Sequence, residues 1–490
     1  MRLLEAKKIE NQNLKEAIKK MPRFFETPTF TDGQDYLGKY GIFIPEKKRL
    51  PLGYLKLWPQ DFIVEEIFLD NELQTIFPDK FMHKQKDFLP EDPIIYATLV
   101  KCGLSTIEAA EELARMLGLA PKKVLLKSPR QTDRAPQYIK FAGVKDKHAI
   151  TSQIISIREG NVEKLNQISS SNFFVKNIFS GQKELYLGAL RENQFTIFIR
   201  TGRDFKKEEF LKRLAEIEKN GFYNFYYLQR FGIPRMVAHQ CGINILKGDY
   251  ENTLKIALCK SSERDRLYFQ SLRREIETLW GDWEEIKGIL EHFPLTFQNE
   301  LLAIDYLIKN PTDFAGALNE IPSQIWLWVD SFSSLLFNNL LSSYIRRGEK
   351  APESLPILSF DERSWSLYKD LLNQAGAFSL TFSLKNLQPF PFVLRKGRGK
   401  TRKTIERIKM LNKKVIPEGV ILNFNLPKGC YATTFLSHLL NLVSGTLPKG
   451  FSNLPIDTKA NLKQPSLEEI LNKFSDVVSS PSWRYLWRIY

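Results

Sequence analysis

The spacing of apolar residues changes twice along this chain of 490 residues, and that change limits the folds the chain can adopt. Polar and apolar residues alternate, as in half-buried strands, at 61–67, 153–157, 194–200 and 420–426. Between 233 and 382, by contrast, apolar residues recur every three or four positions, which is typical of helices. We therefore expect a strand-rich unit that is interrupted by a mainly helical segment and closed by a late strand.

Capping and turn residues predict where single elements begin and end. Ser105 and Glu108 have the spacing of a capping box, and the helix that they start should stop at Gly118. Further along the chain we expect a strand at 138–142, a turn at 143–151 and a helix at 433–443.

Positive charge is concentrated in one stretch of the chain. The 71 Lys and Arg residues exceed the 56 Asp and Glu residues by 15, and the stretch 395–414 alone holds ten basic residues and one acid. Such a surface attracts the phosphates of a nucleic acid, although a solvated basic loop has the same composition. Apolar residues at 405, 408 and 411 predict a basic helix within this stretch. The residues expected to bind phosphate are Arg395, Lys396, Arg398, Lys400, Arg402 and Lys403, with Lys122 and Lys123 from a weaker basic cluster.

The cysteines and the N-terminus bear on the cellular compartment. The four cysteines are scattered and form no C-x-x-C pair, so neither a zinc site nor a disulfide framework is expected. The first ten residues, M-R-L-L-E-A-K-K-I-E, contain acids where a signal peptide has its apolar segment. The longest uncharged stretch, 429–448, is interrupted by polar residues. We therefore expect a cytoplasmic protein that binds no metal and no membrane. Of the possible oligomeric states, we favour a monomer.

One carboxylate is set apart by its neighbours. In the run G-V-K-D-K-H-A-I-T-S-Q at 143–153, Asp146 lies between Lys145 and Lys147 beside a glycine bend. Nearby positive charge lowers the pKa of a carboxyl group, and an ionised, partly desolvated carboxylate can attack an electrophilic carbon. A turn aspartate that binds only its own backbone fits the same residues. The residues alone leave both interpretations open.

Five sequence blocks together resemble the TruD-type pseudouridine synthases. They occur in the order of that family, as L-K-L-W-P-Q-D-F-I-V-E-E at 55–66, F-A-G-V-K-D-K-H-A-I-T-S-Q at 141–153, L-G-A-L-R-E-N-Q-F at 187–195, N-F-Y-Y-L-Q-R-F-G at 224–232 and F-N-L-P-K-G-C-Y-A-T at 424–433. The resemblance covers roughly residues 50–445. The chain departs from the family pattern at Glu192, Tyr227 and Ser437, where a glycine, a small residue and an arginine are usual.

The resemblance implies roles for particular side chains. Asp146 stands at the position of the family's catalytic nucleophile, and Lys56 at that of the lysine that pairs with it. The positions that contact and enclose the target base are taken by Phe62, Asn193, Phe195 and Tyr431. Rings and an amide suit a uracil taken out of its helix, because they offer a stacking surface and hydrogen bonds to the base edge. From periodicity alone, Phe62 and Phe195 would be core residues of strands.

The fold implied by the resemblance is α+β, with a mixed, largely antiparallel pseudouridine-synthase sheet flanked by helices and with an inserted α/β domain. The expected divisions are an N-terminal extension at 1–48, a catalytic domain in two parts at 49–232 and 386–445, the inserted domain at 233–385 and a C-terminal extension at 446–490. RNA is expected between the two domains.

The activity implied by the resemblance is the isomerisation of a uridine in RNA to pseudouridine, without a cofactor. The expected substrate is tRNA, at position 13 in the D arm, and other RNA targets are an alternative. A second hypothesis is a catalytically silent RNA-binding or RNA-folding protein on the same scaffold. A third, a hydrolase or phosphotransferase, is disfavoured because the sequence has no phosphate-loop motif and no paired carboxylates near Asp146.

Overall fold

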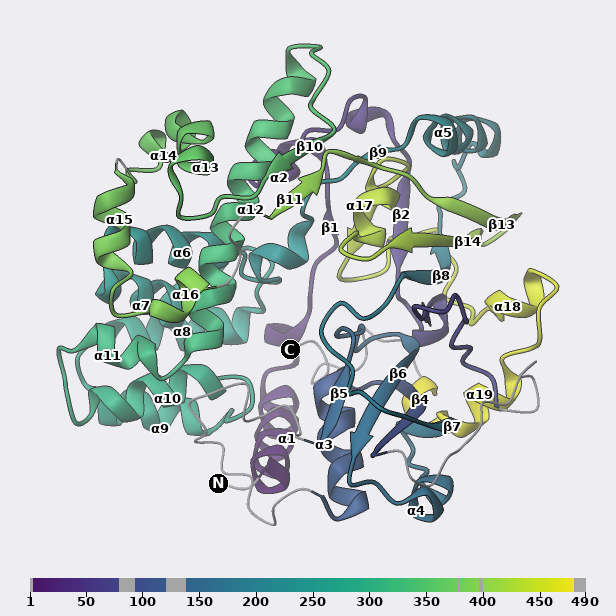
Figure 1. Ribbon diagram of the computed structural model, residues 1–490, viewed down its shortest axis with the longest axis horizontal. Helices are drawn as coiled ribbons and strands as arrows, with labels where there is room; N and C mark the ends of the chain where they lie inside the picture. Colours follow the sequence, from purple (N-terminus) through teal and green to yellow (C-terminus); the bar gives the residue numbers. More distant parts are fainter. Residues whose placement is uncertain (1–2, 79–92, 120–137, 378, 396–399, 480–490) are drawn as a thin grey trace.

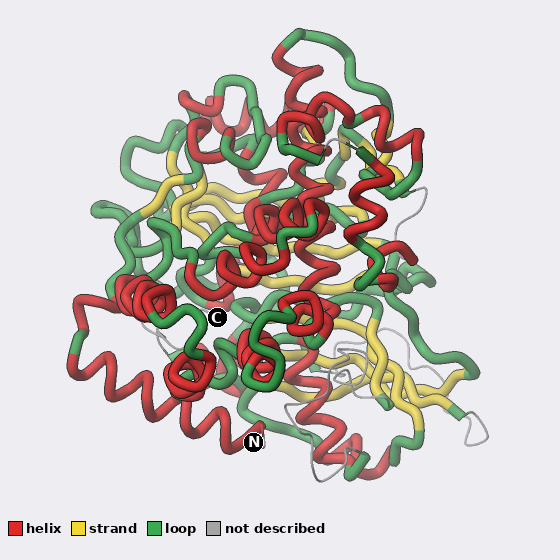
Figure 2. The backbone as a smooth tube through the Cα atoms, turned by 90° about the vertical axis from the view of Figure 1, so that its left-hand side faces the viewer, coloured by secondary structure: helices red, strands yellow, loops and turns green. Residues whose placement is uncertain are grey.

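A large sheet and a group of helices lie side by side in the computed structural model, which describes residues 3–78, 93–119, 138–377, 379–395 and 400–479. Figure 1 shows the sheet on the right and the helices α6 to α11 and α13 to α16 on the left. Figure 2, viewed from the side of these helices, shows strands behind them. The expected α+β class is confirmed.

Eleven of the described strands form the main sheet. They are β1 (Phe30–Thr31), β2 (Leu52–Leu55), β3 (Phe62–Ile67), β4 (Ile94–Cys102), β5 (Ile139–Phe141), β6 (Ile150–Arg158), β7 (Phe173–Gly181), β8 (Glu192–Arg200), β13 (Lys409–Ile416), β14 (Gly419–Pro427) and β15 (Asn441–Ser444). Two smaller pairs join β9 (Phe222–Tyr223) to β12 (Ile405–Glu406) and β10 (Ser354–Pro356) to β11 (Thr401–Lys403).

The late strand expected from the sequence lies inside the sheet. The main strand order is β1-β15-β2-β8-β3-β6-β4-β7, and β14 also pairs with β8, antiparallel from Gly419 opposite Arg200 to Pro427 opposite Glu192. Among the described strands, the pairs β2–β15 and β3–β6 are parallel and the other pairs are antiparallel. The sheet is therefore mixed and largely antiparallel, and it is closed by residues distant in the sequence.

The two faces of the sheet are covered differently. We call the face that carries Val64, Phe195 and Phe424 the front face. It is covered by the helices α3 (Thr106–Leu117), α4 (Val162–Gln167), α5 (Lys207–Asn220) and α17 (Ala432–Ser437), with α2 (Gln34–Gly38) at the edge of the same core. The back face is covered by the C-terminal helices α18 (Thr458–Asn461), α19 (Glu468–Lys473) and α20 (Ser475–Val478).

The capping prediction for α3 is confirmed. Ser105 is the N-cap, its side chain accepts a hydrogen bond from the N–H of Glu108, and Gly118 ends the helix with a φ of 76°. The apolar stripe of α3 packs on β4, β5 and β6. The helix therefore covers the front face beside the loop at 143–149.

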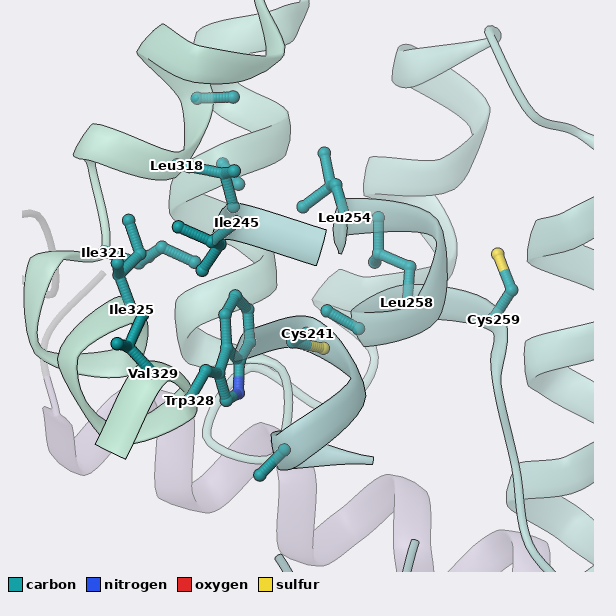
Figure 3. Packing of buried hydrophobic residues seen from close by; sticks show 14 of the residues in the cluster. Cys241, Ile245, Leu254, Leu258, Cys259, Leu318, Ile321, Ile325, Trp328 and Val329 are labelled. Atoms are coloured by element: carbon teal, nitrogen blue, oxygen red, sulfur yellow. The ribbon is translucent and has the colours of Figure 1, made fainter. Parts of the chain in front are cut away.

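The segment between the two parts of the sheet is helical. Its helices are α6 (Ala238–Lys247), α7 (Tyr250–Cys259), α8 (Leu267–Thr278), α9 (Trp283–Glu291), α10 (Gln298–Leu307), α11 (Phe314–Asn319), α12 (Pro322–Arg346), α13 (Glu362–Leu367), α14 (Lys369–Gln374), α15 (Leu380–Asn386) and α16 (Pro391–Arg395). In the described part of 233–385, β10 is the one strand, so this segment differs from the expected α/β composition. The reason is its helical apolar spacing, which buries helix against helix, as Figure 3 shows around Trp328.

Contact between α6 and α12 is close at one glycine. A Cβ atom on Gly242 would lie 2.2 Å from the carbonyl oxygen of Trp328, so a larger residue would separate the two helices. The first half of α12 is buried in this helical core, whereas Phe337 and Leu341 from its second half are buried in the core on the front face of the sheet. One helix thus joins the two cores.

The N-terminal residues pack on both cores. The helix α1 (Leu3–Lys20) lies on the helical segment, where the carboxylate of Glu10 accepts hydrogen bonds from the backbone N–H groups of Leu295 and Thr296 at 2.6 and 3.0 Å. Further along, β1 pairs with β15 at the edge of the sheet. Residues 3–48 are therefore built into the folded structure.

Two predicted helices are wrong. Residues 405–411, expected as a basic helix, lie in β12 and β13, because Ile405 pairs with Tyr223 and β13 forms an antiparallel hairpin with β14. Tertiary pairing overrides the local preference here. The helix expected over 433–443 ends at Ser437, and Asn441–Ser444 instead forms β15 beside β2.

No helix in the described part of the chain combines the length and the apolar composition that crossing a bilayer requires.

Candidate active site

Asp146 lies in the loop that connects β5 to β6, over the front face of the sheet. Its Oδ2 atom accepts a hydrogen bond from Nζ of Lys56, with which it forms an ion pair, and its Oδ1 accepts one from the backbone N–H of His148 at 3.2 Å. The side chains of Lys56 and Asp146 are 23% and 32% exposed, so a ligand can reach the carboxylate. The structure brings together the two residues that the resemblance pairs.

This ion pair keeps Asp146 ionised. Burial raises the pKa of Asp146, but the charge of Lys56, its hydrogen bond and the N–H of His148 lower it, and the net result is a pKa below the ordinary value for a carboxyl group. Asp146 is thus an anion at neutral pH.

The two lysines next to Asp146 in the sequence have other partners. Lys145 forms a buried ion pair with Glu66 at 2.6 Å, and Lys147 forms one with Glu108 at 2.9 Å. The expectation that these neighbours hold Asp146 ionised is therefore wrong, because the loop directs their side chains to either side. The cation that pairs with Asp146 is Lys56, the residue after β2, 90 residues earlier in the chain.

Buried side chains hold the loop around Asp146 from below. The amide of Gln153 donates a hydrogen bond to the carbonyl of Gly143 at 2.9 Å, and the hydroxyl of Thr106 donates to Gln153 at 2.8 Å while it accepts one from the N–H of Lys145 at 2.8 Å. The ammonium group of Lys101 donates to the carbonyl of Asp146 itself at 2.8 Å. The loop is thus attached to β4, β6 and the first turn of α3.

Burial lowers the pKa of Lys101 to about 8, an effect that the nearby Asp146 opposes. Lys101 therefore remains mostly a cation at pH 7 and places a second positive charge below the loop of Asp146.

Lys56 is positioned by a turn that a buried ion pair fixes. Its backbone has a φ of 59°, a left-handed conformation that is unfavourable for a residue with a side chain. In the turn that follows, the carboxylate of Asp61 accepts hydrogen bonds from the N–H of Trp58 at 2.9 Å and from Arg200, which binds both carboxylate oxygens. Asp61 and Arg200 are fully buried, and the next residue, Phe62, has its ring 4.1 Å from Nζ of Lys56. The turn directs Lys56 toward Asp146.

Comparison with known proteins identifies the family. The family model described as tRNA pseudouridine synthase D (TruD) matches residues 51–357, which is more than half of the chain. The chain belongs to the TruD family. As a member of this family it is a pseudouridine synthase, which is an isomerase.

Two relatives of this TruD chain are assigned as tRNA pseudouridine synthase D. The one from Methanopyrus kandleri is 27% identical over 319 residues, which cover 61% of this chain and 77% of the relative. The one from Thermococcus sibiricus is 27% identical over 444 residues, which cover 79% and 94%. A crystal structure assigned as a TruD protein of Methanosarcina mazei superposes with a TM-score of 0.58 at 22% identity, over 82% of this chain and 97% of the other, and it supports the fold.

The two phenylalanines that the TruD pattern assigns to base contact lie in the sheet next to the ion pair. Phe62 on β3 and Phe195 on β8 have their ring centroids 6.0 Å apart, and the ring of Phe195 stacks on Phe424 of β14 at 5.5 Å. Phe62 and Phe195 are 4% and 8% exposed. They are core residues of their strands, as their periodicity indicates, and they form the floor beneath Lys56 and the loop of Asp146.

Asn193 lies directly opposite Glu66 in the β3–β8 pair of this TruD fold. Its Oδ1 accepts a hydrogen bond from Nζ of Lys145 at 2.6 Å, and the same ammonium group pairs with Glu66. Because Lys145 holds Oδ1, the donor end of the amide, Nδ2, is directed away from Lys145. Lys145 thereby orients Asn193.

Tyr431 is the N-cap of α17 and is partly exposed. Its ring contacts Tyr226 edge-on at 6.4 Å, and the guanidinium group of Arg402 lies 4.1 Å from the ring of Tyr226. Arg402 donates hydrogen bonds to the carbonyls of Asn224 and Gly429, both at 2.8 Å. Of the basic residues expected to bind phosphate, Arg402 is thus occupied in holding the 224–232 block and the loop before Tyr431.

The other basic residues expected at the TruD interface are placed only in part. Lys400, just before β11, and Lys403, its last residue, are exposed. The backbone of Arg395 ends α16. Lys396, Arg398, Lys122 and Lys123 lie outside the described residues.

Several residues of this TruD site were not predicted individually. Glu66, Gln153 and Thr106 shape the loop of Asp146, and Lys101 binds its carbonyl. A signal was present for two of them, since Glu66 and Gln153 close the sequence blocks 55–66 and 141–153. Thr106 and Lys101 carry no such signal, because their function comes from contacts across the sheet.

Proposed function

We propose that this chain converts a uridine of tRNA to pseudouridine and that Asp146 is the nucleophile. The observation that carries the proposal is the ionised Asp146 carboxylate, paired with Lys56 and one third exposed above a floor of phenylalanine rings. A carboxylate in this state can form a transient covalent bond to an electrophilic carbon. Relatives assigned as tRNA pseudouridine synthase D support tRNA as the substrate.

The reaction exchanges one bond of the uridine for another. The bond between N1 of uracil and C1′ of ribose breaks, the base turns, and a bond between C5 and C1′ forms, while C5 loses a proton and N1 gains one. The composition of the RNA is unchanged. Asp146 would bond to C1′ or to the base in between, and each of its oxygens retains a lone pair besides the one that binds Lys56 or His148.

The detached base has to be held while it turns, and we propose that the floor and its rim do so. Phe62 and Phe195 would support the uracil, and Nδ2 of Asn193 would donate to a uracil carbonyl because Lys145 occupies the other end of the amide. Tyr431 would close the pocket from the side of α17. Rings that exclude water and one oriented amide restrict the poses of the base.

We also propose that position 13 in the D arm is the target and that basic residues hold the phosphates around it. Lys400 and Lys403 are exposed, which supports a role for them, and Arg395, Lys396, Arg398, Lys122 and Lys123 are proposed from the sequence alone. Arg402 would act indirectly, by holding the loop that carries Tyr431. In this proposal 49–232 and 386–445 form the catalytic domain and 233–385 the inserted one. A mainly helical core and a core on the sheet support two units, and the boundaries themselves rest on the sequence, since Leu387 and Phe390 pack in the helical core and Phe337 in the core of the sheet.

The decisive experiment compares the wild-type chain with Asp146→Asn on an unmodified tRNA transcript. Chemical mapping should find one new pseudouridine with the wild type and none with Asp146→Asn, because the amide is a poor nucleophile. The position of the modified nucleotide tests the D-arm assignment in the same measurement.

Measuring how tightly the two proteins bind the same tRNA distinguishes the catalytic proposal from the silent RNA-binding protein. The catalytic proposal requires Asp146→Asn to bind tRNA with little change while it makes no product. A wild type that binds tRNA and forms no pseudouridine would instead support the silent RNA-binding protein, and full activity of Asp146→Asn would exclude Asp146 as the nucleophile.

A further inference from the structure

Three apolar side chains next to the catalytic loop point into solvent. Val144, Tyr186 and Leu187 are 60%, 66% and 75% exposed, and we call these three residues the apolar lip. Exposed apolar residues that cluster beside a functional site mark an interaction surface more often than single ones do. The lip is therefore a candidate interaction surface.

The turn that carries Tyr186 and Leu187 is firmly attached, so their exposure is not the result of a loose loop. Leu185 and Leu190 on either side of them are buried in one core with Ala142. The N–H of Leu185 donates to the hydroxyl of Ser156 at 2.9 Å, and the hydroxyl of Tyr96 donates to the carbonyl of Lys183. The turn thus presents its two apolar side chains in a fixed position.

The lip is continuous with the active site. The N–H of Gly188, in the turn of Tyr186, donates to the carbonyl of Ala142 at 2.7 Å, just before the loop of Asp146 begins. Val144 lies two residues before Asp146 in that same loop. Lys428 lies in the loop that leads to Tyr431, and its ammonium group donates a hydrogen bond to the carbonyl of Gly188 at 3.0 Å. The lip therefore sits where the loops of Asp146 and Tyr431 meet the turn before β8, the strand of Asn193.

We propose that the lip binds the nucleobase next to the target uridine, by stacking on Tyr186 against Leu187 and Val144. The inference rests on the proposed function, since it takes RNA as the substrate. A uridine that is turned out of a helix leaves its neighbour unstacked, and an exposed ring is the surface on which such a base stacks. The exposed cations Lys183, Arg191 and Lys428 flank the turn and match the charge of an RNA backbone.

Substitution of the ring tests the proposal through the steady-state kinetics of the full chain on tRNA. Tyr186→Ala should raise KM by roughly 5- to 150-fold, the range for the loss of one base–ring stack. Its kcat should stay within about twofold of wild type, because the lip binds ground state and transition state alike. Tyr186→Phe keeps the ring and should keep the wild-type KM. Phe382→Ala removes another exposed aromatic ring, 47% exposed on α15, and should also leave KM unchanged.

A fluorescent base gives a direct readout of stacking. A tRNA with 2-aminopurine on the 5′ or the 3′ side of the target should be quenched by the wild type at one of these positions, and less so by Tyr186→Ala. A wild-type KM and unaltered quenching for Tyr186→Ala would overturn the proposal. So would a Tyr186→Ala variant that loses self-association of the protein while its KM is unchanged, because the lip would then be a protein interface. Failure of the proposed function looks different, because the wild type would then form no pseudouridine.

Discussion

At the scale of single residues, one lysine decides the charge of the nucleophile. Burial raises the pKa of Asp146 and Lys56 lowers it, so removal of Lys56 leaves the effect of burial opposed by the smaller contribution of His148. A group with a lowered pKa is ionised above that pKa, and activity is lost as the pH falls through it. We predict that Lys56→Met moves the acidic limb of the pH–rate profile upward by about 1 to 3 pH units, measured by single-turnover formation of pseudouridine.

A neighbouring lysine provides the control for this prediction. Lys147 is next to Asp146 in the sequence but pairs with Glu108, so Lys147→Met should leave the acidic limb where it is. If Lys56→Met and the wild type share one pH profile, Lys56 does not set the ionisation of Asp146.

At the scale of elements, the position of the catalytic loop depends on its attachment to α3 and β6. Thr106→Val keeps the volume of the side chain but leaves the N–H of Lys145 and the amide oxygen of Gln153 each without the hydroxyl that now binds it. We predict a loss of about 1–3 kcal/mol in the free energy of unfolding, together with a lower kcat as the loop shifts. Chemical denaturation and turnover of saturating tRNA measure the two effects.

A second buried threonine separates stability from catalysis. Thr98 lies on β4 and donates to Gln74 at 2.6 Å, on the side of the sheet away from the loop. Thr98→Val should lower the free energy of unfolding by a similar amount with kcat unchanged. An equal fall in kcat for both variants would show that Thr106 acts through stability alone.

At the scale of the whole molecule, α12 connects the helical core to the core of the sheet. Asn338 lies next to Phe337, where the helix passes from one core to the other. Its amide accepts a hydrogen bond from the N–H of Tyr226 at 2.9 Å and donates to the carbonyls of Tyr226 and Tyr40 at 2.9 and 3.0 Å. We predict that Asn338→Ala costs on the order of 3 kcal/mol in the free energy of unfolding, because three buried backbone groups lose their partner.

Ser333 on the same helix is the matched control. It is buried too, but its hydroxyl donates to the carbonyl of Val329 within α12, so Ser333→Ala should cost less than about 1 kcal/mol. Both free energies come from urea unfolding followed by tryptophan fluorescence. Equal losses for the two variants would contradict a special role of Asn338 between the cores.

Local sequence patterns were sufficient to predict an element where its contacts join residues close in sequence. The capping box of Ser105 and Glu108 predicted the start of α3, and alternation predicted β3, β8 and β14, because a helix cap and a strand face involve residues close in sequence. The blocks resembling the TruD family pointed to Asp146 and Lys56, although these two residues are 90 positions apart.

What the sequence by itself determined is thus most of the strands and helices cited above and, through the family resemblance, the carboxylate at the centre of the site and its lysine partner. The tertiary structure decided that the two lysines adjacent to that carboxylate do not pair with it, because side chains next to each other in a loop point to different neighbours, as Lys145 and Lys147 do. It also decided that 405–411 pairs as strands and that Tyr186 and Leu187 remain in solvent, since strand pairing and exposure depend on what the rest of the chain places alongside.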